Sequence, residues 1–172
     1  VLHSFILEQM YVRLTSYASY SMHQDVIRIC QKMILLDKTN IKAWTSLGYA
    51  YIDENKSEQA IQAFETALKL NPEGKAASFE LGKIYFAKKD YLNAIVYFEN
   101  IHLAGEKVDV KLNADILKYR HGKKGLRSLR SMEELLLMLS QAYHITGHQD
   151  QAIKLQQEYE SYKLKNKRNL FF

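Results

Sequence analysis

A repeat with a period of 34 residues constrains the fold of this chain more than any other feature of its sequence. The segment 44–72 recurs at 78–106, and five of the eight positions that mark its apolar pattern are identical at that offset. Self-similarity at a fixed period of this length indicates small units that cannot cover their own apolar faces and must stack on a neighbour. The identical pairs are Leu47 and Leu81, Gly48 and Gly82, Tyr51 and Tyr85, Ala60 and Ala94, and Phe64 and Phe98.

Each unit contains two runs of apolar residues at helical spacing. Trp44, Leu47 and Tyr51 lie on one face of a first helix, and a second run surrounds Phe64 after a polar turn. The single proline, Pro72, ends the second helix because proline disfavours helical geometry in the residue before it. The predicted helices are 41–53, 57–70, 75–87 and 91–102.

These residues resemble the tetratricopeptide repeat. The family's pattern stands here as Trp44-x2-Leu47-Gly48-x2-Tyr51, Ala60-x3-Phe64-x2-Ala67 and Pro72, with the family's spacing throughout. The resemblance implies an all-α, right-handed superhelical solenoid of about four antiparallel helical hairpins, with a concave face that binds proteins or peptides. We expect a single array over 1–172, with repeats at 7–40, 41–74, 75–108 and 133–166 and a basic insertion at 109–132.

The resemblance also indicates which side chains face a partner. In the family, four positions of each first helix tend to face the concave surface, and here several of them are large and apolar, as binding anchors often are. We therefore expect a non-enzymatic scaffold or adaptor that binds a protein or peptide segment, with two lysines selecting acidic flanks. The candidate groove residues are Tyr11, Thr15, Lys42, Thr45, Tyr49, Ile52, Phe79, Lys83 and Phe86.

Two alternatives remain open beside this interpretation. The resemblance permits a secretion-type chaperone that holds an apolar segment. In addition, the insertion 109–132 contains seven bases and two acids, in a chain of net charge +5, and such residues attract polyanions in a salt-dependent way. Nucleic acid or an anionic membrane would then bind at Lys118, Arg120, Lys123, Lys124, Arg127 and Arg130. Polyanion binding is the less favoured interpretation, because a basic run of this kind is more often a solvated loop, and nucleic acid is not an expected partner.

No arrangement of residue types in the sequence predicts catalysis. His144 and His148 are four residues apart, but Gly147 interrupts the helix that would bring both imidazoles to one face. Cys30 occupies an apolar helical position, where a thiol behaves as a small hydrophobe. We expect no enzymatic activity, no cofactor and no metal site.

The ends and the hydropathy of the chain add two further expectations. The sequence does not begin with methionine and ends in two phenylalanines, which suggests a piece of a longer protein. Assembly into a larger complex is a separate expectation for a protein-binding array. No run approaches the roughly 18–20 apolar residues of a membrane span, and no secretory signal pattern is visible. A cytoplasmic location is favoured.

Overall fold

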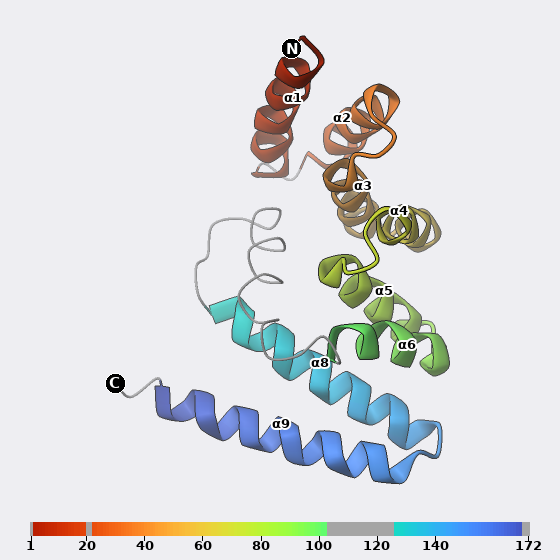
Figure 1. Cartoon of the computed structure of the whole chain (residues 1–172), viewed down its shortest axis with the longest axis vertical. Coiled ribbons are helices and arrows are strands. Elements are labelled where there is room, and N and C mark those ends of the chain that lie inside the picture. Colours follow the sequence, from red (N-terminus) through yellow and green to blue (C-terminus); the bar gives the residue numbers. More distant parts are fainter. Residues whose placement is uncertain (1, 20–21, 103–125, 170–172) are drawn as a thin grey trace. The chain divides into compact units, whose positions relative to one another are not determined.

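The computed structural model describes residues 2–19, 22–102 and 126–169, and within these ranges it contains helices and no strand (Figure 1). The four helices predicted from the repeat are confirmed, with both ends at the predicted residues. The fold class is therefore all-α, as the sequence predicts. The helices are α1 (Leu2–Ser19), α2 (His23–Leu36), α3 (Ile41–Asp53), α4 (Ser57–Leu70), α5 (Lys75–Ala87), α6 (Tyr91–His102), α8 (Leu126–Ile145) and α9 (Gln149–Asn169).

The chain divides into two compact units, with the division between Ala77 and Ser78. In the first unit α1 packs on α2, α2 on α3, and α3 on α4. Its core joins residues from all four helices, with aromatic rings packed around a group of small and branched aliphatic side chains. The buried members are Leu14, Val26, Ile27, Cys30, Leu47, Ala50 and Ala63, and Tyr11, Tyr17, Trp44 and Tyr51 are among the residues that pack against them.

Cys30 lies in this core with no exposed surface. Burial raises the pKa of its thiol from 9.0 to about 12, because the thiolate would lose its hydration there. The thiol therefore stays protonated in the native state at ordinary pH, as a packing residue would.

The second unit contains the remainder of α5 together with α6, α8 and α9. Helix α6 packs on α8, and α8 packs on α9. Helix α8 begins at Leu126, so the last residues of the predicted insertion 109–132 belong to the first helix of the last hairpin. The rest of that insertion lies outside the described residues. Among the helices of the described ranges, none has the length and apolar character needed to cross a bilayer.

Two glycines set the distance between the helices of the inner hairpins. A Cβ atom built on Gly48 would lie 2.6 Å from the ring of Phe64, and one on Gly82 would lie 2.4 Å from the ring of Phe98. Both phenylalanine rings are completely buried. The glycine on the first helix thus leaves the space that the ring on the second helix fills, which explains why both residues repeat at the same spacing.

The turns inside three hairpins share one backbone conformation. Asn55, Lys89 and Gly147 have φ angles of 58°, 63° and 85°, each just after a first helix. In the α5–α6 turn, Lys89 N donates to Phe86 O at 2.9 Å and Asp90 N donates to Tyr85 O at 2.9 Å. This pair of bonds is the Schellman motif, which satisfies carbonyls at the end of a helix and favours glycine at the left-handed position. The interruption of the helix that the sequence predicts at Gly147 is confirmed.

Lys89 holds this left-handed conformation without being glycine, which costs roughly 1–2 kcal/mol for a residue with a Cβ. We expect Lys89→Gly to raise the free energy of unfolding by about 0.5–1 kcal/mol, since part of the gain is offset by the greater freedom of glycine in the unfolded chain. Urea denaturation followed by circular dichroism measures the change. The neighbouring change Lys88→Gly is the control, and it should give no gain; an equal gain in both variants would contradict the explanation.

Candidate functional site

In the first unit, the predicted groove residues Tyr11 and Lys42 lie together on α1 and α3. The Tyr11 hydroxyl donates to Asn40 Oδ1 at 2.6 Å, and Lys42 Nζ lies 5.6 Å from the centre of the Tyr11 ring. Burial raises the pKa of Tyr11, so the hydroxyl remains a donor. A cation above an aromatic face is attracted by the ring's quadrupole. These contacts hold a half-buried ring and an exposed ammonium in one place.

Asn40, which is not among the site residues predicted from the sequence, organises this arrangement. Its Oδ1 also accepts from Ala43 N at 3.0 Å, which makes it the N-cap of α3. One side-chain oxygen therefore begins the helix and orients the Tyr11 ring. An asparagine directly before a predicted helix is a recognisable capping signal, but its second bond to a residue 29 positions away has no sequence signal.

Thr45 and Ile52 continue the same face of α3, and both are half-buried. The Thr45 hydroxyl donates to Ile41 O at 2.8 Å. Tyr49, predicted as an exposed anchor, is only 2% exposed, and its ring meets that of Phe64 edge-on at 5.3 Å. The expected exposure of Tyr49 is therefore wrong, because the ring packs against the aromatic residue that the repeat pattern places in the second helix.

In the second unit Phe79 is likewise buried, at 2% exposure, and lies 6.3 Å from the Phe98 ring. It too was expected to be exposed, and this expectation is wrong for the same reason. Phe86 is half-buried and meets the Tyr91 ring edge-on at 5.3 Å. Of the predicted aromatic anchors, Tyr11 and Phe86 thus retain accessible surface.

Lys83 lies in a different electrostatic environment from Lys42. Its ammonium is 5.2 Å from the Phe79 ring centre, 3.5 Å from Glu80 Oε2 and 3.9 Å from Glu134 Oε1. Glu80 is almost fully buried, so its charge needs a nearby cation. The two carboxylates already neutralise Lys83, whereas no carboxylate in the described part of the chain forms an ion pair with Lys42.

Several predicted site residues have side chains that the structure does not describe. Lys118, Arg120, Lys123 and Lys124 of the alternative basic site lie outside the described residues. Thr15, Arg127 and Arg130 lie on helices α1 and α8, but their side chains are outside what the structure describes. The basic site therefore stays a prediction.

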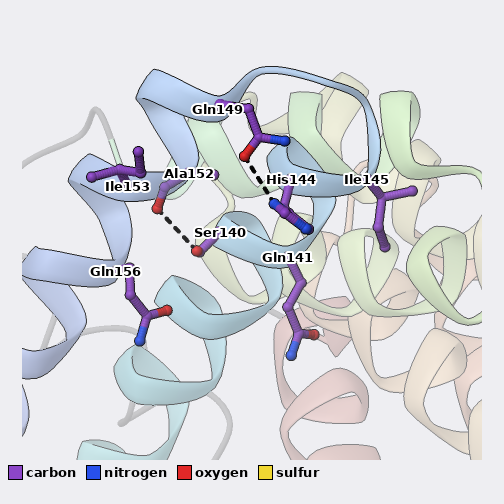
Figure 2. Close-up of a pocket in the computed structure, with 8 residues that line it drawn as sticks. All are labelled: Ser140, Gln141, His144, Ile145, Gln149, Ala152, Ile153 and Gln156. Carbon is purple, nitrogen blue, oxygen red and sulfur yellow. Dashed lines mark hydrogen bonds between the residues drawn. The ribbon is translucent and has the colours of Figure 1, made fainter.

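His144 and His148 lie around the last turn, and each bonds to a neutral neighbour. His144 Nδ1 lies 2.9 Å from Gln149 Oε1, as Figure 2 shows, and His148 Nδ1 lies 3.0 Å from Thr146 Oγ1. The His148 ring also meets the ring of Tyr143 at 5.8 Å. These contacts connect the end of α8 to the start of α9.

Tyr143 joins the last hairpin to α6 of the preceding hairpin, although the insertion 109–132 separates the two hairpins in the sequence. Its hydroxyl donates to Glu99 on α6. Partial burial, with a smaller contribution from this carboxylate, raises the pKa of Tyr143 from 10.0 to about 12. A second contact joins α6 to α9, where His102 Nε2 lies 3.0 Å from Glu158 Oε2.

We expect Tyr143→Phe to lower the free energy of unfolding by roughly 0.5–1.5 kcal/mol, the usual net value of one hydrogen bond. Because the native pKa is raised, the contribution of Tyr143 is complete below pH 10 and is lost as the pH rises from 10 towards 12. Urea denaturation at pH 8 and pH 11 measures both effects. In the variant the fall in stability between these two pH values should be smaller.

Tyr159→Phe is the matched control, because it removes a hydroxyl from the same hairpin at a ring that lies 5.4 Å from Lys163 Nζ and is not part of the α6–α8 contact. If both variants kept the alkaline loss of the parent chain, Tyr143 would not be its source.

Comparison with known proteins gives the same family that the repeat pattern resembles. Residues 45–105 match a family model described as a tetratricopeptide repeat. Human tetratricopeptide repeat protein 21B is 32% identical over 78 residues, which are 45% of this chain and 6% of that protein. Anaphase-promoting complex subunit 3 of Schizosaccharomyces pombe is 28% identical over 97 residues, 54% of this chain and 15% of that protein. The chain thus spans a small part of the length of these relatives.

Solved structures resemble the fold over more of the chain. A crystal structure of MamA has a TM-score of 0.67 at 22% identity and covers 94% of this chain and 80% of its own. The Yersinia enterocolitica type III secretion chaperone SycD, in complex with a peptide of the translocator YopD, has a TM-score of 0.62 at 14% identity, covering 82% of this chain and 95% of its own. At these identities the likeness concerns the fold alone.

Proposed function

Because this chain is a member of the tetratricopeptide repeat family, we propose that it is a non-enzymatic scaffold that holds a peptide segment of a partner protein. The segment binds to the first-helix surface of the first unit, which we define as Tyr11, Lys42, Thr45 and Ile52. The observation that carries this proposal is the exposed Lys42 ammonium above the Tyr11 ring, whose hydroxyl is held by Asn40.

The chemistry of this surface suits a mixed peptide with at least one carboxylate. Tyr11 and Ile52 are half-buried and offer apolar contact to a side chain of the peptide. Lys42 supplies the positive charge, and the Tyr11 ring attracts its ammonium to the place where a carboxylate of the peptide would bind. A charge at the edge of an interface mainly raises the association rate and selects the partner.

A structural neighbour supports the capacity of this fold to hold a peptide. SycD was solved with a peptide of the translocator YopD bound to it. The secretion-type chaperone predicted as an alternative is one form of this activity, in which the partner segment is apolar. The two differ in the peptide they require: the proposed scaffold needs an acidic residue that binds Lys42, whereas a purely apolar chaperone does not.

Selection from a random peptide library displayed on phage, with the full chain as bait, tests the proposal. We expect the enriched peptides to combine apolar residues with Asp or Glu. Lys42→Glu should weaken a selected peptide by about tenfold, as expected when an attractive charge pair becomes repulsive. Lys32→Glu on α2 makes the same charge change at another exposed lysine and should leave binding unchanged.

The salt dependence of binding distinguishes peptide binding from the predicted polyanion alternative. Binding to nucleic acid or an anionic membrane through the insertion should fall steeply as the salt concentration rises, with a slope set by the number of phosphates contacted. A peptide held by one charge and by apolar contacts should lose little affinity over the same range of salt concentration. If no peptide is enriched, or if both lysine variants lose affinity equally, the first-helix surface is not the binding site.

A further inference from the structure

Asn40, at the beginning of α3, is held by four hydrogen bonds, and none of them uses its side-chain nitrogen. Its backbone N donates to Asp37 O at 3.2 Å, and its backbone O accepts from Trp44 N at 3.1 Å. Its Oδ1 accepts from the Tyr11 hydroxyl at 2.6 Å and from Ala43 N at 3.0 Å. Across the residues that the structure describes, no acceptor bonds to Asn40 Nδ2, so both of its hydrogens are available to a ligand.

These bonds fix the orientation of the Asn40 amide. The oxygen and nitrogen of a carboxamide have similar size, so its orientation is assigned from its hydrogen-bond partners. A backbone N–H can only donate, and the side-chain atom that faces Ala43 N is therefore the oxygen. The amide nitrogen lies on the other side of the group and is open to solvent, since the buried side-chain polar atoms without a partner in the described residues do not include it.

The Tyr11 ring brings the Asn40 amide and the Lys42 ammonium to one place. The amide lies at the hydroxyl of the ring, and Lys42 Nζ lies 5.6 Å from the ring centre. Lys42 is exposed, and its ammonium carries three donor hydrogens. Two different donor groups thus border one half-buried aromatic ring, whose accessible surface can contact the apolar stem of a ligand side chain.

Asp37, in the turn before α3, limits what the positive charge of Lys42 can do alone. Asp37 Oδ1 accepts from Thr39 N at 2.9 Å and from Thr39 Oγ1 at 2.6 Å. Burial is the main cause that raises the pKa of Tyr11, and the nearby charge of Asp37 is one of the smaller causes. Because this charge offsets that of Lys42, an anion gains little from net charge and needs a second, directed donor.

We propose that Asn40 is a specificity-determining residue of the peptide site, where its Nδ2 and the Lys42 ammonium each donate to the carboxylate of an Asp or Glu in the partner segment. This inference rests on the proposed function and names the group that the first-helix surface binds. A carboxylate suits the two donors because it accepts through both of its oxygens. The neutral amide of Gln suits them less, since it lacks the charge and its nitrogen is itself a donor. The backbone at the start of α3 is not the site, because Ala43 N is already bonded to Asn40.

Asn40→Asp tests the proposal with a nearly isosteric change. Aspartate keeps an oxygen for the Tyr11 hydroxyl and for Ala43 N and is as good an N-cap as asparagine, so the variant should melt close to the parent chain. It replaces the Nδ2 donor by an oxygen that repels a carboxylate. Fluorescence polarisation with a library-selected peptide that contains Glu should show binding about tenfold weaker or more, whereas the Glu→Gln counterpart of that peptide should lose no affinity, because its amide can donate to the new oxygen.

A second pair of variants separates the hydrogen bond from the added charge. Tyr11→Phe removes the hydroxyl and leaves the Asn40 amide bonded to Ala43 N. Asn40→Ser in this background keeps an N-cap oxygen and removes the amide without adding a charge. We expect the added serine change to weaken the Glu peptide by about tenfold, as for a hydrogen bond to a charged group, and the Gln peptide much less. Equal weakening of both peptides would mean that Asn40 only supports the fold, and would overturn the proposal.

Two further variants separate this inference from the proposed function. Gln31→Glu makes the same amide-to-carboxylate change at an exposed position of α2 and should leave binding unchanged; a loss equal to that of Asn40→Asp would overturn the inference. If Lys42→Met weakens the Glu peptide while the changes at Asn40 do not, the proposed function stands and the inference is overturned. If no peptide is enriched, or if none of the changes at Lys42 and Asn40 alters binding, both are overturned.

Discussion

Phe98→Ala should lower the free energy of unfolding by about 3–5 kcal/mol, and Phe64→Ala should cost a similar amount. Both rings are completely buried and sit against the glycine of the paired helix. Alanine would remove the buried ring surface and leave a cavity between the two helices. The helices cannot move together to close it, because their other buried side chains also hold them apart. Urea denaturation followed by circular dichroism measures the loss.

The control for Phe98 lies on the same helix. Leu92 is 65% exposed on α6, and Leu92→Ala should change the free energy of unfolding by less than about 0.5 kcal/mol. A cost below about 1 kcal/mol for both phenylalanine variants would mean that the glycine–phenylalanine contact does not organise the hairpins.

Tyr49→Ala and Phe79→Ala should each be strongly destabilising, by about 3–5 kcal/mol, as expected for a buried aromatic residue changed to alanine. The sequence alone predicts the opposite, because both residues occupy positions that face the concave surface in the family. Because they are only 2% exposed and contact Phe64 and Phe98, the two residues are part of the packed interior and not exposed binding anchors. Thermal melting of the two variants measures the effect.

Phe86→Ala provides the comparison, because Phe86 was predicted from the same rule but remains half-buried. It should cost clearly less than Phe79→Ala. If Tyr49→Ala and Phe79→Ala melted like the parent chain, both rings would be accessible in solution and the original groove would be restored as the candidate site.

The helix boundaries can be predicted from the sequence because the ends of a helix depend on local chemistry. The residue before Pro72 cannot easily remain helical, and α4 ends at Leu70. Gly48 and Phe64 recur in the next repeat because the paired helices touch at these residues. This contact between helices is therefore visible in the sequence as a glycine and a phenylalanine at a fixed separation. The α8–α9 turn follows in the same way from Gly147.

The candidate site could be predicted only in part, because exposure depends on neighbours that lie outside one helix. Tyr11 and Tyr49 both occupy positions that face the concave surface in the family, but the ring of Tyr49 is covered by Phe64. Trp44 shows the reverse: its place in the repeat pattern indicates a buried ring, yet it is half-buried, with Nε1 donating to Lys38 O at 2.9 Å. Long-range polar contacts such as that of Tyr143 with Glu99 leave no periodic trace.

A charge-swap experiment between Lys42 and the acidic residue of a selected peptide tests the proposed function most directly. Dissociation constants are measured by fluorescence polarisation for the parent chain and Lys42→Glu, each with the acidic peptide and with its lysine counterpart. If the peptide lies on the first-helix surface, each single change should weaken binding by about tenfold, and the double change should recover most of that loss. Two losses that simply add in the double change would contradict the account, because Lys42 would then not meet the peptide's carboxylate.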